Sequence, residues 1–264
     1  MTAVATAMTL AQRAHAMRRT VVEMCRGRGQ GYVGQGLGLA DLMACLYFSE
    51  LRDGVDHFVL STGHSAIGVF AALHERGVYD LDELRTYGMD GSRIEESPLE
   101  GTPGFEITGG SLGQGVSQAV GMALGERLNG NGGRVYCLVS DGELQEGQVW
   151  EAFMAAGHLH LDNLVVIVDN NHMQADGATA DVMDVEPVPE KLAAFGFAAR
   201  RIDANSIDEV LDAFAWAKEQ REQPVGLVCE IVPGKGVPSL EAYEKVHYIR
   251  AADEVWAKAL DELA

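Results

Sequence analysis

The sequence predicts an α/β protein with a doubly wound, mostly parallel β-sheet and helices on both faces. Two observations lead to this class. The apolar periodicity alternates between helical and strand-like along the whole chain. Glycine is frequent, with 31 residues, many of which stand where apolar runs end, as tight turns between strands and helices require. No linker or shift in composition divides the 264 residues, so we expect a single domain over 1–264.

The periodicity places the elements in order along the chain. The N-terminal residues indicate an amphipathic helix, and Leu10, Ala14, Met17, Val21 and Met24 fall on one helical face. Further helices are expected over 39–51, 65–76, 81–88, 112–128, 145–160, 189–195, 206–222 and 252–263. Strands are expected over 57–61, 134–140, 164–170, 198–203 and 225–232. Residues 89–109 have weak periodicity and many turn formers, and residues 171–187 are expected to form a loop.

Composition argues against several classes of protein. A net charge of −19 disfavours nucleic acid and anionic membrane surfaces as partners. No stretch approaches 18 apolar residues without a charge or break, and the N-terminus lacks the order of a signal peptide. The four cysteines have apolar neighbours and no metal or disulfide spacing, so we expect reduced core residues of a cytoplasmic protein. They are Cys25, Cys45, Cys137 and Cys229.

Two polar turns follow neighbouring apolar runs. Asp141 and Gly142 come after the run 135–139, and Asn171 comes after the run 164–168. Parallel strands end at the same edge of a sheet, where open α/β sheets bind ligands. A carboxylate and an amide oxygen there, with free backbone carbonyls nearby, suit Mg²⁺, which in turn holds phosphate oxygens. Asp-Gly at 141–142 and Asn-Asn at 170–171 could each form an ordinary turn. Because both follow apolar runs that are expected to be neighbouring strands, together they predict a metal-bridged diphosphate site.

The sequences around these turns resemble the transketolase family. Asp-Gly followed about thirty residues later by Asn-Asn is similar to the thiamine diphosphate fingerprint, and ELQEGQVWEA and DNLVVIVDNN flank the two turns. The likeness is greatest to split members whose N-terminal half is a separate chain. It implies the diphosphate-binding (PP-type) thiamine diphosphate fold. It also implies Mg²⁺, with Ca²⁺ or Mn²⁺ as alternatives, held by Asp141, Asn171 and the Met173 carbonyl. Ser140 replaces the family's usual glycine.

Two further stretches extend the resemblance. GGSLGQG, residues 109–115, is similar to a recurrent family sequence that lies against the cofactor, which implies contacts from Gly110 and Leu112. His64 follows the expected strand 57–61 in a Ser-x-Gly-His context, similar to a family histidine that contacts cofactor and substrate. The structural alternatives are a flexible loop and a histidine satisfied by its surroundings.

Glu146 and His247 complete the implied site. Glu146 lies in LQEG, where the family has a glutamate at a subunit interface near the cofactor, although helix N-termini favour acids in any case. His247 follows Gly-Lys-Gly at 234–236 and resembles a family histidine that faces the substrate channel; the alternative is a surface histidine. The resemblance therefore implies catalytic roles for His64, His247 and Glu146, and cofactor contacts from His64, Gly110, Leu112, Asp141, Gly142, Glu146 and Asn171.

Two family histidines are absent. Tyr32 stands at the position of one, in QGYVGQGLGLA, and Thr102 stands at the position of the other. These family side chains contact the sugar, so their replacement leaves the cofactor site intact but points away from standard sugar-phosphate specificity. Tyrosine can donate a hydrogen bond but does not change charge near neutral pH. The sequence does not identify the donor or acceptor sugar, or whether either carries phosphate.

The resemblance implies one subunit of a heteromeric transferase. Transketolases move a two-carbon ketol unit from a ketose, commonly a phosphate ester, to an aldose. The chain stops before the family's pyrimidine-binding domain, whose glutamate activates the cofactor. Activity is therefore expected only with a partner chain that carries this domain, as a heterotetramer with two active sites.

Other functions stay open. One is a 1-deoxyxylulose-phosphate-synthase-like or 2-oxoacid-decarboxylating enzyme with the same cofactor. Another is an inactive subunit that regulates a partner, which the missing histidines motivate and the retained Asp141, Glu146 and Asn171 oppose. A nicotinamide-dependent dehydrogenase would have a similar sheet, but the chain has no GxGxxG after an early strand.

Overall fold

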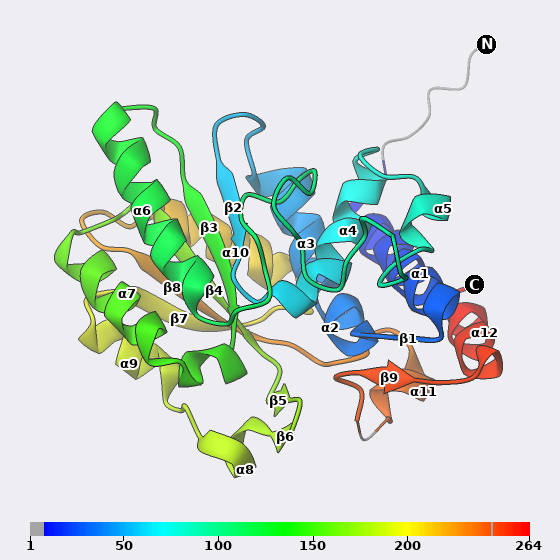
Figure 1. Ribbon diagram of the computed structural model, residues 1–264. Helices are drawn as coiled ribbons and strands as arrows, with labels where there is room; N and C mark the ends of the chain where they lie inside the picture. The colour runs from blue at the N-terminus through cyan, green and yellow to red at the C-terminus, as the bar shows by residue number, and fades with distance from the viewer. Residues whose placement is uncertain (1–7, 244) are drawn as a thin grey trace.

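A five-stranded parallel sheet forms the centre of the computed structural model, which describes residues 8–243 and 245–264 (Figure 1). The strands are β2 (His57–Leu60), β3 (Val135–Ser140), β4 (Leu164–Asn170), β7 (Ala198–Asp203) and β8 (Val225–Glu230). Their order in the sheet is β2-β3-β4-β8-β7, and every neighbouring pair is parallel. The doubly wound α/β class expected from the sequence is confirmed. Residues 1–7 of the expected first helix lie outside the described residues.

Helices cover both faces of this sheet, because successive strand residues point to opposite sides. On one face, α6 (Gln114–Asn129), α7 (Gly147–His158) and α9 (Val188–Ala194) pack against side chains such as Val139 and Val168. On the other face, Leu138 and Ile167 belong to a larger core that includes α1 (Leu10–Arg28), α4 (Ala66–Glu75) and α10 (Ile207–Glu219). Burial on both faces explains why the inner strands β3, β4 and β8 are nearly continuous apolar runs, whereas the edge strand β7 carries Arg200 and Arg201.

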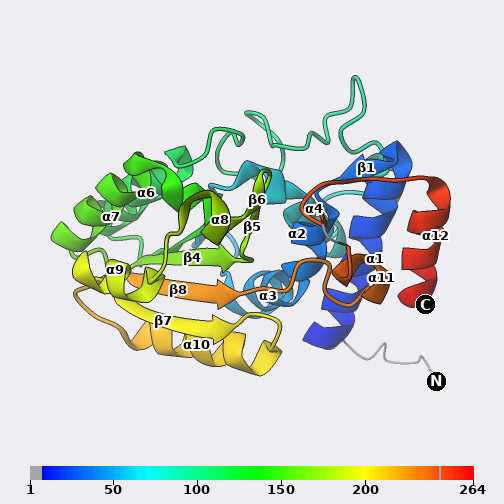
Figure 2. The same ribbon diagram turned by 90° about the horizontal axis from the view of Figure 1, so that it is seen from below.

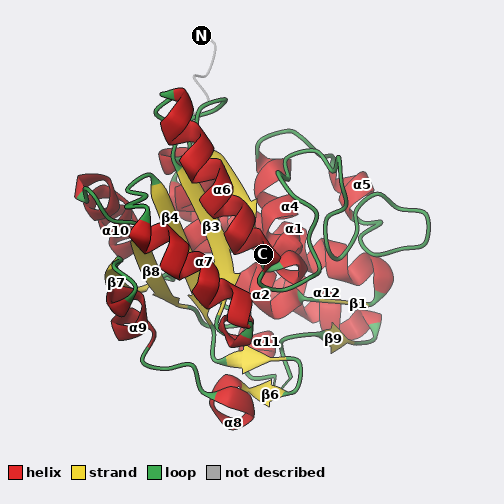
Figure 3. Ribbon diagram, turned by 60° about the vertical axis from the view of Figure 1, so that its left-hand side comes forward, coloured by secondary structure: helices red, strands yellow, loops and turns green. Residues whose placement is uncertain are grey.

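Parallel strands bring the carboxyl ends of β4, β8 and β7 to one edge, and Figure 2 shows their arrowheads pointing the same way. The long loop between α5 (Leu81–Leu84) and α6 is green in Figure 3 and covers residues 85–113. The antiparallel pair β1 (Gln30–Gly31) and β9 (Ile249–Arg250) joins a segment near the N-terminus to one near the C-terminus, with Gly31 opposite Ile249. This pairing carries Tyr32 toward the segment that contains His247.

The helix expected over 39–51 begins earlier and is interrupted. The structure has α2 (Val33–Gly38), α3 (Ala40–Cys45) and a five-residue π-helix, Leu46–Glu50. Glycines lower helix propensity and hid α2 from the periodicity. Packing requires at least one of them, since a β-carbon at Gly34 would lie 2.4 Å from the Val246 carbonyl oxygen. Tertiary contact overrides local propensity here.

The loop expected over 171–187 contains regular structure. Residues Met173–Gln174 (β5) pair antiparallel with Gly177–Ala178 (β6), and α8 (Thr179–Met183) follows. Strands of two residues are too short to produce a periodic signal. The remaining elements are short helices at Gly63–Ser65 and Gly142–Gln145, with α11 (Pro238–Glu241) and α12 (Asp253–Glu262). The helix expected over 81–88 is shorter in the structure and consists of α5 alone, Leu81–Leu84.

All four cysteines are buried and free, as the sequence predicts. Within the described ranges, none of the helices combines the length and apolar content needed to cross a bilayer.

The contact between α7 and the end of α9 leaves no room for a side chain at Gly157. A β-carbon there would lie 1.8 Å from the carbonyl oxygen of Phe195. We expect Gly157→Ala to lower the free energy of unfolding by about 1–3 kcal/mol, because the backbone must shift. At Gly121 in α6, no described atom beyond its own stretch of helix lies within 4 Å of an added β-carbon, so Gly121→Ala is expected to raise stability by about 0.5–1 kcal/mol. Urea denaturation of both variants distinguishes these outcomes; equal stabilities contradict the packing.

Candidate active site at the carboxyl edge of the sheet

The ends of β3 and β4 bring Asp141 and Asn171 to the same edge of the sheet. Ser140 is paired with Asp169 in the register of the two strands, and the Asp141 N–H donates to the Asp169 carbonyl at 3.0 Å. Both side chains are nearly inaccessible, with exposed fractions of 1% for Asp141 and 5% for Asn171. The arrangement that the strand topology predicts is therefore present.

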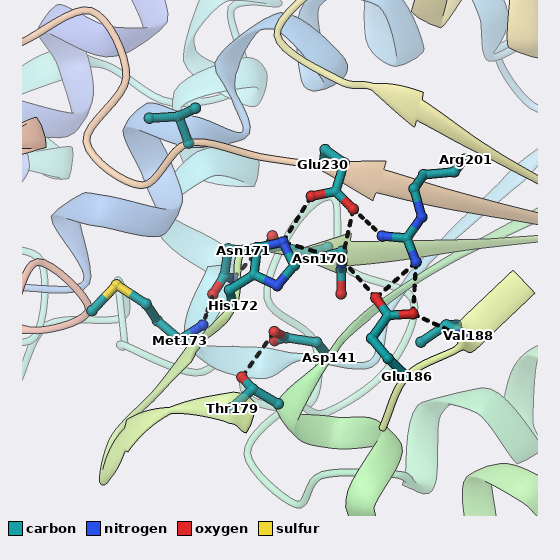
Figure 4. Close-up of polar contacts among 12 residues, drawn as sticks. Asp141, Asn170, Asn171, His172, Met173, Thr179, Glu186, Val188, Arg201 and Glu230 are labelled. Carbon is teal, nitrogen blue, oxygen red and sulfur yellow. Dashed lines mark hydrogen bonds and ion pairs between the residues drawn. The ribbon is translucent and has the colours of Figure 1, made fainter. Parts of the chain in front are cut away.

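Hydrogen bonds fix both side chains (Figure 4). One oxygen of Asp141 accepts from the Gly142 N–H at 2.8 Å, and the other accepts from the Thr179 hydroxyl at 2.9 Å. The Asn171 amide oxygen accepts from the Met173 N–H at 3.0 Å, and its amide nitrogen donates to Asp169 at 2.9 Å. Burial raises the pKa of Asp141, and the hydrogen bonds to Thr179 and Gly142 oppose that shift.

Asp169 is a buried carboxylate that sequence reasoning missed. One of its oxygens has no hydrogen-bond partner among the described residues. Burial, and then the charge of Asp141, raise the pKa of Asp169 to about 8. A positive charge at this edge would stabilise both ionised carboxyls. The sequence offered no signal, because an aspartate at the end of a strand is also a common turn residue.

The donor set at this edge fits a hard divalent cation. In the described part of the chain, no three histidine, cysteine, aspartate or glutamate side chains converge as a metal-binding cluster. The available donors are instead a carboxylate, an amide oxygen and main-chain carbonyls, which are the oxygen ligands that Mg²⁺ and Ca²⁺ prefer. The unpartnered oxygen of Asp169 lies near this set, and a cation there would lower the pKa of this carboxyl.

Glu143 connects three segments around the site. This buried carboxylate accepts hydrogen bonds from the Ser61 hydroxyl and, at 2.6 Å, from the Gly113 N–H. The Ser140 N–H donates to its other oxygen at 3.4 Å. It therefore holds the end of β2, the 109–115 loop and the end of β3 together. Sequence reasoning chose Glu146 instead, since nothing local distinguishes a buried acid from an exposed one three residues away.

The 109–115 loop packs directly on the turn that carries His64. A β-carbon at Gly63 would lie 2.4 Å from the Gly110 nitrogen, so the two backbones are in contact. Gly110 itself has φ 109°, a conformation that side chains disfavour. The glycines of these two segments therefore allow a close approach that other residues would prevent.

A cavity of about 400 Å³ lies at this edge of the sheet. Asp141 and Asn171 do not line it, but their neighbours Ser140, Gly142 and Met173 do. The other lining residues that the sequence singled out are Tyr32, His64, Gly110, Leu112, Glu146 and His247. A second cavity of about 650 Å³ shares Tyr32, Met173 and His247 with the first and extends to Glu96, Lys245 and Tyr248. Most of the residues that the sequence singled out thus face one space.

Four rings form one wall between the two cavities. The ring centroid of Tyr32 lies 5.1 Å from His64, 5.6 Å from His247 and 4.8 Å from Tyr248. The two histidine rings are 5.2 Å apart. Burial, with the nearby His247, lowers the pKa of His64 to about 3, and burial lowers the pKa of His247 to about 4. Both histidines are therefore neutral near pH 7.

Polar partners behind this wall were not found from the sequence. The Gln35 amide nitrogen contacts Nδ1 of His247, and Gln35 is buried. The Tyr248 hydroxyl donates to Glu96 at 3.0 Å, and Arg28 pairs with the same carboxylate at 2.9 Å. Gln35 lies in α2, which the sequence did not predict. Its contact spans 212 positions, a distance over which local patterns carry no information.

Glu146 and Thr102 contribute less to the site than the sequence led us to expect or lie outside it. Glu146 is the N-cap residue of α7 and is exposed, and its side chain makes no capping bond within the described residues. It lines the smaller cavity. The Thr102 hydroxyl accepts from the Leu99 N–H at 3.1 Å, and Thr102 lines neither cavity. Tyr32 therefore takes a position in the site, whereas Thr102 caps its own loop.

Comparisons with known proteins agree with this geometry. Residues 10–259 match the model of the transketolase thiamine diphosphate binding domain. An uncharacterized transketolase family protein of Sinorhizobium fredii is 46% identical over 96% of this chain and 94% of its own length. A 6-deoxy-6-sulfo-D-fructose transketolase subunit of Clostridium sp. is 34% identical over 96% of each.

The solved transketolase of Leishmania mexicana superposes with a TM-score of 0.89 at 30% identity, over 98% of this chain. The chain spans only 42% of that larger enzyme. Because the family model covers nearly all of the chain and the relatives match it end to end, the chain belongs to the transketolase family and corresponds to its thiamine diphosphate binding domain.

Proposed function

We propose that this chain is the N-terminal, diphosphate-binding subunit of a split transketolase. With thiamine diphosphate and Mg²⁺, the assembled enzyme transfers a two-carbon ketol unit from a ketose, or ketose phosphate, to an aldose. The observation that carries the proposal is the position of Asp141 and Asn171, buried on adjacent strand ends beneath a cavity lined by His64 and His247.

The chain's own residues account for cofactor binding. Asp141, Asn171 and the Met173 carbonyl would hold Mg²⁺, or Ca²⁺ or Mn²⁺ in its place, and the cation would neutralise the diphosphate. Gly110 and Gly142 admit the diphosphate close to the backbone, and each lines the cavity. Leu112, His64 and Glu146 line the same cavity, where they would contact the bound cofactor. When bound, thiamine diphosphate supplies the carbanion chemistry, and the protein supplies orientation and electrostatics.

His64 and His247 act on the substrate as neutral groups. Their low pKa values mean that each ring presents one N–H donor and one lone pair near pH 7. Such a ring binds a sugar hydroxyl or carbonyl by hydrogen bonds, as a donor through its N–H and as an acceptor through its lone pair. Tyr32, 5.1 Å from His64 between ring centroids, adds a hydroxyl to the same wall.

A second chain completes the active site. The chain spans 42% of the Leishmania enzyme, and the Clostridium relative is itself named a subunit. Glu146 is exposed at the rim of the cavity, where a partner that carries the pyrimidine-binding domain would meet it. We propose a heterotetramer with two active sites, located in the cytoplasm, where four free buried cysteines stay reduced. The Clostridium relative is named for a 6-deoxy-6-sulfo sugar, so test substrates should include modified sugars.

Asp141→Asn tests the metal site with little change in shape. We expect Mg²⁺-dependent binding of thiamine diphosphate to weaken beyond the roughly 10–100-fold typical of residues that only orient ligands, because a charged ligand is lost. Isothermal titration calorimetry measures this. Asp181→Asn is the control, since Asp181 is exposed in α8, and its affinity should match the wild type. Unchanged affinity in Asp141→Asn refutes the assignment.

A mixing experiment tests the split enzyme. We expect ketol transfer only when this chain is combined with a chain carrying the pyrimidine-binding domain, because that domain supplies the activating glutamate. Mass spectrometry of products from a panel of ketoses, sugar phosphates and pyruvate measures it. Full transfer by this chain alone contradicts the need for a partner. Decarboxylation of pyruvate as the main reaction favours the synthase-like alternative, and no reaction with any partner favours a regulatory subunit.

The neutral state of His64 predicts how stability depends on pH. The pKa of His64 is about 3 in the folded chain and about 6.5 in the unfolded chain, so only the unfolded chain takes up a proton as the pH falls through 6.5. Between about pH 7 and pH 5, the wild type should lose about 1–2 kcal/mol more stability than His64→Gln. Urea denaturation at both pH values measures this. His158→Gln, at an exposed position, should follow the wild type; identical slopes for all three would disprove burial as the cause.

A further inference from the structure

We infer that Arg201, on β7 at the far edge of the sheet, is a positioning residue for the metal-binding loop 171–173. The inference rests on the proposed function, because it assigns Asn171 and Met173 as donors to the cation. Arg201 contacts neither of them. It acts through a chain of side chains that crosses the carboxyl ends of β7, β8 and β4 (Figure 4).

His172 is the link between the two donors. It has φ 60°, a left-handed conformation that costs a non-glycine residue about 1–2 kcal/mol unless its surroundings hold it. Two contacts hold it. Its ring Nε2 donates to Glu230 at 2.7 Å, and its carbonyl accepts from the Thr179 N–H at 3.0 Å. The His172 conformation fixes the directions of the flanking residues Asn171 and Met173.

Glu230 is fixed in turn by strand ends and by Arg201. It is the last residue of β8, and it is paired in register with Asn170, the last residue of β4. The Asn170 amide donates to Glu230 at 2.8 Å and to Glu186 at 3.3 Å. Two carboxylates therefore converge on one amide. Without a cation between them, their like charges would repel each other and displace Glu230 from His172.

Arg201 supplies that cation. One nitrogen of its guanidinium contacts Glu230, and the other lies 2.7 Å from both oxygens of Glu186. Glu186 also accepts from the Val188 N–H at 2.8 Å, which ties the network to the start of α9. The planar guanidinium binds two carboxylates in a fixed geometry, which an ammonium does not reproduce. The network therefore holds the metal-binding loop against three strand ends.

An ordinary surface ion pair is the competing explanation. The three charged side chains are each about one-third exposed, at 34–35%, and isolated pairs of this kind contribute little to stability. The two explanations differ in what they predict. A surface pair changes overall stability slightly and leaves the loop unchanged. A positioning network changes the loop and its ligand affinity while most of the fold is unaffected.

Arg200 provides a matched control on the same strand. It lies next to Arg201, so its side chain points to the opposite face. There it pairs with Asp212 at 2.9 Å and stacks on Trp216 in α10. Arg200→Met and Arg201→Met remove the same charge from adjacent positions with similar exposure of 30% and 35%. Any difference between them reports on the network rather than on net charge.

The experiment measures two quantities on the full chain. The first is hydrogen–deuterium exchange of residues 170–178 in the chain without added ligand. The second is the Mg²⁺ concentration needed for half-maximal binding of thiamine diphosphate, measured by calorimetry. For Arg201→Met we expect faster exchange confined to this loop and about a tenfold higher Mg²⁺ requirement, the low end for residues that orient ligands. Arg201→Lys should recover part of both effects, and Arg200→Met should behave as the wild type.

The outcomes separate the two proposals. Wild-type exchange and Mg²⁺ requirement in Arg201→Met overturn the positioning role and leave the proposed function intact. Equal changes in Arg200→Met also overturn it, because the effect would then come from charge alone. If the wild-type chain binds no thiamine diphosphate with or without its partner, the proposed function fails. The exchange measurement still decides whether Arg201 holds the loop. Near-isosteric Glu230→Gln, which weakens the same link, repeats the test if Arg201→Met does not fold.

Discussion

The burial of two neighbouring carboxylates, Asp141 and Asp169, is the constraint on which the site depends. Strand register places them at adjacent ends of β3 and β4, and one oxygen of Asp169 has no partner among the described residues. Burial raises the pKa of both. With raised pKa values, these two buried carboxyls ionise together only when a positive charge lies nearby. The sheet topology therefore provides a site that fits the cation proposed above.

Around Asp141 and Asp169, segments far apart in the sequence are fixed by a few buried polar contacts. Glu143 holds the glycine-rich loop to the ends of two strands, and Gln35 reaches the ring of His247 from α2. Arg201 contacts Glu230, which in turn pairs with His172 in the loop after β4. Each contact places a polar group where it has a partner, so the backbone around the cavity has few alternative positions. The site is therefore preorganised before any ligand binds.

The aromatic wall gives this member of the family its own character. Tyr32 stands beside His64 and His247, at the position where the sequence resemblance implies a histidine, and Tyr248 packs on it from the β9 side. A phenol in place of an imidazole keeps a hydrogen-bond donor but loses a group that titrates near neutrality. Under the proposed function, the expected cofactor contacts Gly110, Leu112 and Gly142 line the cavity, and Tyr32 is a difference on the substrate side. This division fits a chain that keeps the family chemistry and applies it to its own substrate.

The sequence by itself determined the class of fold, the five central strands to within a few residues, and the family. It also predicted that Asp141 and Asn171 would meet, because parallel strands must end at one edge of a sheet. Only the tertiary structure revealed α2, the β5–β6 hairpin, the buried state of Asp169 and the partners Glu143, Gln35 and Arg201. The reason is physical. Burial and contacts between distant residues arise from packing, and neither leaves a periodic pattern in the local sequence.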